Sequence, residues 1–136
     1  MLIADSSAWI QWFRSANSAA DLALDQALEG EQVLLIEPVR AELMFGARSK
    51  SEASEMHRLF ESIDIALIAP RDDFEAAVHL HLQARSLGVT PRGLIDCLTV
   101  SIAARLQLPV LHHDRDFCRL LPVAGVAEVQ GSLQLS

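Results

Sequence analysis

Five acidic side chains stand at positions where a metal-dependent enzyme could use them. Asp5 ends the first apolar run of the chain, and Glu42 lies in a predicted helix after the second. Asp96 lies near the start of an apolar helix, and Asp114 and Asp116 follow a short apolar run. Carboxylate oxygens without paired Cys or His ligands suit the hard ions Mg²⁺ and Mn²⁺. We therefore predict that the fold gathers these five carboxylates around metal ions.

Each of these acids has a simpler explanation when it is taken alone. Asp and Glu are common at helix N-termini, where they bond free amides and complement the helix dipole, and Asp116 fits this explanation best. Asp96 fits it least, because it lies between Ile95 and Cys97 in an otherwise apolar helix, where an unpaired charge is costly to bury. The argument for a shared site therefore rests on the joint occurrence of all five acids.

The predicted site has the chemistry needed for phosphodiester hydrolysis. A divalent ion polarises a phosphate oxygen and lowers the pKa of a bound water, and two ions about 3.5–4 Å apart stabilise the attacking and leaving oxygens together. Carboxylates this close raise one another's pKa when no ion is bound. His112 and His113 could add a ligand or an acid, although we expect that one of them simply ends a strand.

The segments that carry these acids alternate between strands and helices. The strand segments are continuous apolar runs, which are typical of a parallel sheet covered on both faces. The sequence therefore predicts an α/β fold in a single domain, residues 1–136, with a central parallel sheet of four to five strands flanked by helices on both faces. Strands are predicted at 1–5, 33–36, 63–68, 109–112 and 126–129. Helices are predicted from Ser6 or Ser7, at 19–28, 38–49 and 51–62, from Asp72 or Asp73 to 87, from 94, and at 114–121, with a frayed tail after 129.

The order of the elements gives a reason for the acids to meet. In a parallel α/β sheet, functional groups gather beyond the carboxyl ends of the strands. Asp5, Asp114 and Asp116 directly follow predicted strands, and Glu42 follows one by a short connection. Asp96 reaches the same edge only if its helix begins there.

Composition sets limits on the partners of the chain. Its 136 residues are 51% hydrophobic and 21% charged, which is typical of a globular domain. The net charge of -7 opposes nucleic-acid binding, but the objection weakens if the acids cluster around cations. No apolar run approaches the ~20 residues of a membrane span, and Met1 leads straight into a strand without a signal sequence. We expect a cytoplasmic protein that contacts no membrane, with Cys97 and Cys118 as buried free thiols.

An aromatic helix follows the first acid. Trp9, Trp12 and Phe13 are spaced as on one broad face of a helix. The face is either plain core or partly a surface for a partner, because both tryptophans of the chain lie there. The sequence leaves both interpretations open.

Four motifs in register resemble the PIN-domain ribonucleases, and more narrowly the VapC toxins of bacterial toxin–antitoxin pairs. Any one motif is weak evidence, but together they cover essentially the whole chain in the order of that family. The motifs are Asp5-Ser-Ser, Arg40-Ala-Glu42-Leu-Met-Phe-Gly46, the Asp96 helix ending in Ala103-Ala104, and Val110-Leu-His-His-Asp114-Arg-Asp116-Phe117.

The resemblance implies metal-dependent cleavage of internal RNA bonds, with Mg²⁺ or Mn²⁺ as the cofactor. It also implies a homodimer and a cognate VapB-like antitoxin that docks on the toxin and blocks its site. The metal-binding catalytic carboxylates would be Asp5, Glu42, Asp96 and Asp114, with Asp116 as an auxiliary ligand or a supporting acid.

Two further positions and one helix face acquire an interpretation from the resemblance. Ser7 matches the hydroxyl residue that supports the first Asp. Many relatives carry Thr two residues before the fourth acid, where this chain has His112, and this departure leaves open how Asp114 is hydrogen-bonded. The face of Trp9, Trp12 and Phe13 becomes a candidate surface for the antitoxin.

Two other functional classes compete with the ribonuclease interpretation. A phosphatase of the haloacid-dehalogenase type would use Asp5 as a covalent nucleophile, but it needs a second Asp two residues later, where this chain has Ser7, and its only Lys is Lys50. A non-catalytic PIN-like binding module would use the acids for structure alone. Metal-dependent cutting of internal RNA bonds distinguishes the ribonuclease from both.

Overall fold

The fold is described from a computed structural model, which covers residues 1–135. Helices and strands alternate along most of the chain, as the sequence predicts. In chain order the elements are β1 (Ile3–Ala4), α1 (Ser6–Phe13), α2 (Ala19–Glu29), β2 (Leu35–Ile36), α3 (Glu37–Phe45), α4 (Lys50–Glu61), β3 (Ile65–Ala66), α5 (Pro70–Ser86), α6 (Leu94–Leu106), β4 (Val110–Leu111) and α7 (Arg115–Ala124).

The strands form a parallel arrangement with the order β3, β2, β1, β4. β1 pairs with β4 and β2 pairs with β3, and both pairs are parallel. A single parallel bridge between Leu2 and Val33 joins the two pairs. A second bridge, between Val110 and Glu128, takes the place of the predicted fifth strand. The predicted α/β class is confirmed, although each regular strand has only two residues.

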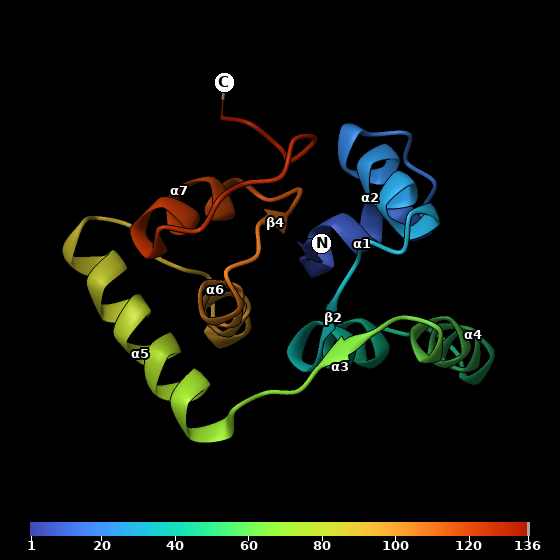
Figure 1. The fold of residues 1–136 in the computed structure, drawn as a ribbon, viewed down its shortest axis with the longest axis horizontal. Helices are drawn as coiled ribbons and strands as arrows, with labels where there is room; N and C mark the ends of the chain where they lie inside the picture. The colour runs from blue at the N-terminus through green and yellow to red at the C-terminus, as the bar shows by residue number, and fades with distance from the viewer. Residues whose placement is uncertain (136) are drawn as a thin grey trace.

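Helices cover both sides of these strands, with α1 and α2 on one side and α5 and α6 on the other (Figure 1). The strands are buried because they are apolar throughout: Ile3, Leu35 and Leu111 are each at most 1% exposed. α6 contributes the longest unbroken buried stretch among the helices of residues 1–135, because its residues 97–103 are all buried. Its first turn, which carries Asp96, therefore has a fixed position relative to β4.

The start of α5 differs from the prediction. The helix begins at Pro70, with Ala69 as its N-cap, and neither Asp72 nor Asp73 caps it. Proline favours the first helical position because its φ angle is already helical and it has no N–H to satisfy. The Asp73 carboxylate instead accepts the Ala69 N–H at 2.7 Å.

The C-terminal region is more ordered than predicted. α7 runs to Ala124, three residues past its predicted end, and Gly125 ends the helix in the left-handed region at φ 68°. The predicted fraying after 129 is wrong for residues 130–133: Ser132 is buried, and the Leu133 N–H donates to the His112 carbonyl at 3.1 Å.

Both cysteines are free thiols within the described residues, as predicted. Cys97 is buried, but Cys118 is only partly buried, so its predicted burial is wrong. Within residues 1–135, no helix is both long and apolar enough to cross a bilayer.

Candidate active site

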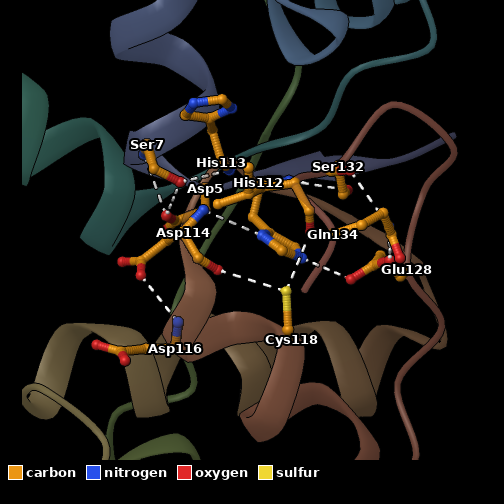
Figure 2. Close-up of polar contacts among 11 residues, drawn as sticks. Asp5, Ser7, His112, His113, Asp114, Asp116, Cys118, Glu128, Ser132 and Gln134 are labelled. Carbon is orange, nitrogen blue, oxygen red and sulfur yellow. Dashed lines mark hydrogen bonds and ion pairs between the residues drawn. The ribbon is translucent and has the colours of Figure 1, made fainter. Parts of the chain in front are cut away.

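Asp5 is the most deeply buried acid of the site, with 3% exposure at the end of β1. It caps α1, and its Oδ2 accepts both the Ser7 hydroxyl at 2.8 Å and the Ser7 backbone N–H at 3.1 Å. The same hydroxyl accepts the His113 N–H at 2.9 Å, so Ser7 links the residues that follow β1 to those that follow β4 (Figure 2). This contact agrees with the supporting role expected of Ser7.

The other oxygen of Asp5 has no such partner. Oδ1 is buried and makes no hydrogen bond within the described residues. Burial raises the pKa of Asp5, since it outweighs the hydrogen bonds from Ser7 and Ser6 that lower it, and the charge of Glu42 raises it further. A buried carboxylate oxygen without a partner is unfavourable unless a cation meets it.

Asp114 is held in place by the backbone around it. It caps α7, and its Oδ1 accepts the Asp116 N–H at 2.9 Å. Its own N–H donates to Nδ1 of His112 at 3.2 Å. The hydrogen bonding that the sequence left open is therefore supplied by the His112 ring.

Asp96 and Glu42 complete the set from two helices. Asp96 lies in the first turn of α6, which brings it to the same cavity as Asp5 and Asp114, as the site requires. Burial raises the pKa of Asp96 to about 7, with further increases from the charges of Asp5, Asp114 and Glu42. Glu42 lies in α3 and is exposed. The raised pKa of Asp96 thus reflects its burial first, and the three neighbouring carboxylates second.

These four carboxylates line one cavity of about 1000 Å³. They come from four separate parts of the chain, which the parallel sheet brings to one edge. Hereafter we call them the acid quartet: Asp5, Glu42, Asp96 and Asp114.

Asp116 does not line the cavity. Its side chain points away from Asp5 and Ser7 (Figure 2) and pairs with Arg92 at 3.3 Å. Nη2 of Arg92 also lies 3.2 Å from Oδ2 of Asp114. Asp116 therefore contacts the quartet through its backbone amide and through a shared arginine.

The same cavity has a long apolar wall beside the acids. We call this wall the apolar groove, and its side chains are Ile10, Trp12, Phe13, Leu43, Met56 and Leu59. Trp9 does not belong to it, because it is fully buried and its ring packs on those of Trp12, Phe13 and Phe60. The expectation that Trp9 is part of a docking face is therefore wrong, whereas Trp12 and Phe13 do line the groove.

Several residues in and near the cavity were not identified from the sequence. Three cations line the cavity: Arg14, Arg48 and Arg92. Arg92 could have been found, since it precedes Asp96 by four residues in a Gly- and Pro-containing loop. Arg14 and Arg48 carry no local signal, because only the packing of α1 and α3 brings them to the cavity. Glu128, which contacts His112 at 2.7 Å, lies outside all the recognised motifs.

The acid quartet fits a hard divalent cation. All of its ligand atoms are carboxylate oxygens, which Mg²⁺ and Mn²⁺ prefer, and the orphaned Oδ1 of Asp5 is the kind of buried acceptor that a cation would satisfy. Burial raises the pKa of both Asp5 and Asp96, and neighbouring carboxylates raise it further; a divalent ion would favour the charged form of both groups. The arrangement can therefore bind metal and activate a phosphate ester for hydrolysis.

Known proteins share this sequence pattern and this fold. The PIN domain profile matches residues 2–120. A VapC ribonuclease of Mycobacterium bovis and ribonuclease VapC11 of Mycobacterium tuberculosis are each 30% identical to the chain over 119 residues, 86% of this chain and 89% of the relative.

Solved structures share the fold of this chain. FitAcB from Neisseria gonorrhoeae superposes with a TM-score of 0.70 at 20% identity, over 96% of this chain and 98% of that one. A toxin–antitoxin complex from Klebsiella pneumoniae gives a TM-score of 0.67 at 20% identity, over 98% and 97%. These matches confirm the resemblance drawn from the four motifs. The chain belongs to the PIN-domain family.

Proposed function

We propose that this chain is an endoribonuclease toxin that depends on Mg²⁺ or Mn²⁺, with the acid quartet as its metal-binding catalytic residues. The observation that carries the proposal is the single cavity that receives all four carboxylates. The relatives at 30% identity are named ribonucleases, which supports RNA as the substrate. We further propose that residues 1–136 act as one domain in the cytoplasm, where RNA is available.

We assign the residues of the cavity separate roles in hydrolysis. When bound, a divalent ion would polarise a phosphate oxygen and activate a water for in-line attack on phosphorus. Ser7 holds Oδ2 of Asp5 and leaves Oδ1 free to act as a ligand. The Asp116 amide fixes Oδ1 of Asp114, and Asp116 itself acts as a supporting acid. Arg14, Arg48 and Arg92 offer the positive charge that an RNA backbone requires.

The cavity also argues against the competing functions. In a phosphatase of the haloacid-dehalogenase type, an acid two residues after Asp5 would protonate the leaving group. That position is Ser7, and its hydroxyl is already engaged between Asp5 and the His113 amide. A binding module without activity would not need a buried carboxylate oxygen that lacks a partner, as Oδ1 of Asp5 does in residues 1–135.

An antitoxin fits the apolar groove. The groove continues directly into the acid quartet within one cavity, so a peptide with apolar side chains and a nearby basic side chain would fill both parts. A solved toxin–antitoxin complex shares this fold. Replacing Trp12 with Ala is expected to weaken antitoxin binding more than folding, because Trp12 is only partly buried. Unchanged affinity would remove this surface from the proposal.

A homodimer is supported by an exposed apolar stripe on α5. Phe74, Val78 and Leu82 are 43%, 53% and 61% exposed and recur every four residues, so they share one face of the helix. Such a stripe is typical of a surface that a second protein covers. A Val78→Glu variant should sediment as a monomer if this stripe joins two copies, and a dimer that persists would exclude it.

The proposed activity can be tested on total cellular RNA. The purified protein, freed of antitoxin, is incubated with Mg²⁺, with Mn²⁺ or with EDTA, beside a folded Asp96→Asn variant as the matched control. We expect discrete internal cuts that need metal and disappear in the variant. Folded wild-type protein that cuts none of the RNA in the presence of metal would contradict the proposal and favour a binding role.

A further inference from the structure

The C-terminal segment 128–134 packs against β4 and against His112, which lies two residues before Asp114 of the acid quartet. The His112 N–H donates to the Ser132 hydroxyl at 3.1 Å, and the Leu133 N–H donates to the His112 carbonyl at 3.1 Å. The β4 residue Val110 also bridges Glu128. This segment lies beyond residues 2–120, the part that matches the PIN domain. Three contacts of the segment thus reach His112 itself, through its N–H, its carbonyl and its ring.

The ring of His112 is fully buried and stacks on Phe117, with 5.5 Å between the ring centroids. Its Nδ1 accepts the Asp114 N–H at 3.2 Å. A nitrogen that accepts an N–H carries no proton of its own, so the ring proton is on Nε2. That nitrogen lies 2.7 Å from Oε2 of Glu128 and donates to it (Figure 2). Glu128 thus selects the tautomer whose free nitrogen faces the Asp114 amide.

Neighbouring groups hold the Glu128 carboxylate in place and keep it charged, so that it can accept this hydrogen bond. Gln134 donates to its other carboxylate oxygen. Although partial burial acts to raise the pKa of Glu128, the hydrogen bonds from Gln134 and His112 lower it overall. The side chain is 28% exposed, so the carboxylate remains hydrated on one side and stays an acceptor.

A metal ion is the competing interpretation of this cluster. Ligand atoms of His112, Cys118 and Glu128 lie within 4.8 Å of one another. However, an ion on Nε2 would require the proton to move to Nδ1, where it would face the Asp114 N–H. The Cys118 thiol already donates to the Leu133 carbonyl at 3.0 Å, and burial raises its pKa, which disfavours the thiolate that metals bind. The geometry therefore favours a hydrogen-bond network.

We propose that Glu128 and His112 are positioning residues: the C-terminal segment fixes the His112 ring, and the ring holds the backbone of Asp114 in the conformation that presents its carboxylate to the cavity. The proposal rests on the proposed function only for the role of Asp114 as a metal ligand. It assigns the tail of this chain a task in the active site, and it explains how the chain functions with histidine at position 112.

The hydrogen-bond geometry can be tested directly on the metal-free wild-type protein. ¹⁵N chemical shifts report which ring nitrogen of His112 carries the proton. We expect a protonated Nε2 and a bare Nδ1, with slow hydrogen exchange at the Asp114 amide. A protonated Nδ1 would overturn the proposal, as would Zn²⁺ uptake by His112, Cys118 and Glu128. This measurement uses no RNA, so it is independent of the proposed ribonuclease activity.

Matched variants then test the effect on metal binding. His112→Asn can keep an acceptor near the Asp114 amide, whereas His112→Leu removes it. Glu128→Gln keeps the acceptor for Nε2, whereas Glu128→Leu removes it, and Gln130→Ala is the control in the same segment. Removing a partner of a metal ligand typically weakens metal binding about 10- to 100-fold. We expect that loss of Mn²⁺ affinity in both Leu variants and less than about threefold in the others.

The outcomes separate positioning from simple stability. Mn²⁺ affinity is measured by calorimetry below the unfolding temperature of each variant, so that only folded protein contributes. Normal affinity in folded Glu128→Leu would overturn the proposal, as would equal losses in Asn and Leu at position 112. If the wild-type protein binds Mn²⁺ with the expected variant pattern but cuts no RNA, the proposed function fails and the positioning role stands.

Discussion

Replacing Asp96 with Asn should stabilise the metal-free protein, and the gain should grow with pH. Burial and three neighbouring acids raise the pKa of Asp96 to about 7, from 3.8 in an unfolded chain. The folded state therefore retains a proton that the unfolded state has released. Stability from this group is fully present below pH 3.8 and is lost as the pH rises through about 7. Asn has nearly the same shape and does not titrate.

The size of the stability difference follows from the raised pKa of Asp96. Between pH 5 and the folded pKa of about 7 lie about two units, and each unit corresponds to about 1.36 kcal/mol. The full value of about 2.7 kcal/mol must be reduced, because Asp96 is only partly buried and solvent screens its charge. We expect the advantage of the Asn variant in unfolding free energy to grow by about 1–2 kcal/mol between pH 5 and pH 8.

Urea denaturation in EDTA measures this difference directly. Both proteins are unfolded at pH 5 and at pH 8, and the free energies are compared at each pH. Addition of Mn²⁺ should reverse the order at pH 8, because only the wild-type protein retains the full acid quartet and ligand binding stabilises the folded state. A pH-independent difference between the two proteins would refute the reasoning, since it would mean that neither burial nor the neighbouring acids raise the pKa of Asp96.

Three further substitutions test other parts of the site and fold. Arg92→Gln removes a cation 3.2 Å from a quartet carboxylate and should tighten Mn²⁺ binding by up to about fivefold, the scale of an exposed ion pair; weaker binding would contradict this. Arg105→Met leaves the carboxylate of Asp73, 2% exposed, without its cation and should lower the unfolding free energy by about 2 kcal/mol at pH 7. Because its neighbours lower the pKa of Asp73 below 3.8, the loss should shrink as the pH falls below that value, and an equal loss at low pH would argue against the ion pair. Ser7→Ala removes the hydroxyl bound to the first acid at 2.8 Å and should weaken Mn²⁺ binding about tenfold. Ser6→Ala is its control, because the Ser6 hydroxyl makes no hydrogen bond in residues 1–135.

Local sequence patterns were sufficient for the fold class and for the placement of the acids. Continuous apolar runs predict buried parallel strands, and the ends of such strands meet at one edge. That reasoning brings Asp5 and Asp114 together correctly. The same reasoning applies to Asp96, since a carboxylate in an apolar helix is costly to bury without a function. The structure places it in the cavity beside the other acids.

Features that depend on long-range packing could not be predicted. Trp9 and Trp12 lie on the same helix, yet only packing against Phe60 shows that Trp9 is core. The sequence predicts a frayed tail because chain ends are poorly ordered unless other contacts hold them. Its order comes from contacts of Ser132 with His112, 20 residues away in the chain. Periodicity carries no information about such contacts.

The end groups of the cleaved RNA test the central claim most directly. If the acid quartet binds divalent ions that activate water, in-line attack on phosphorus with departure of the 3′ oxygen leaves 5′-phosphate and 3′-hydroxyl ends. Mass spectrometry of the fragments made with Mg²⁺ or Mn²⁺ should show these ends, and none should form in EDTA. Fragments with 2′,3′-cyclic phosphate and 5′-hydroxyl ends, formed equally well in EDTA, would show that the ribose hydroxyl is the nucleophile and would contradict a metal-dependent site at these four carboxylates.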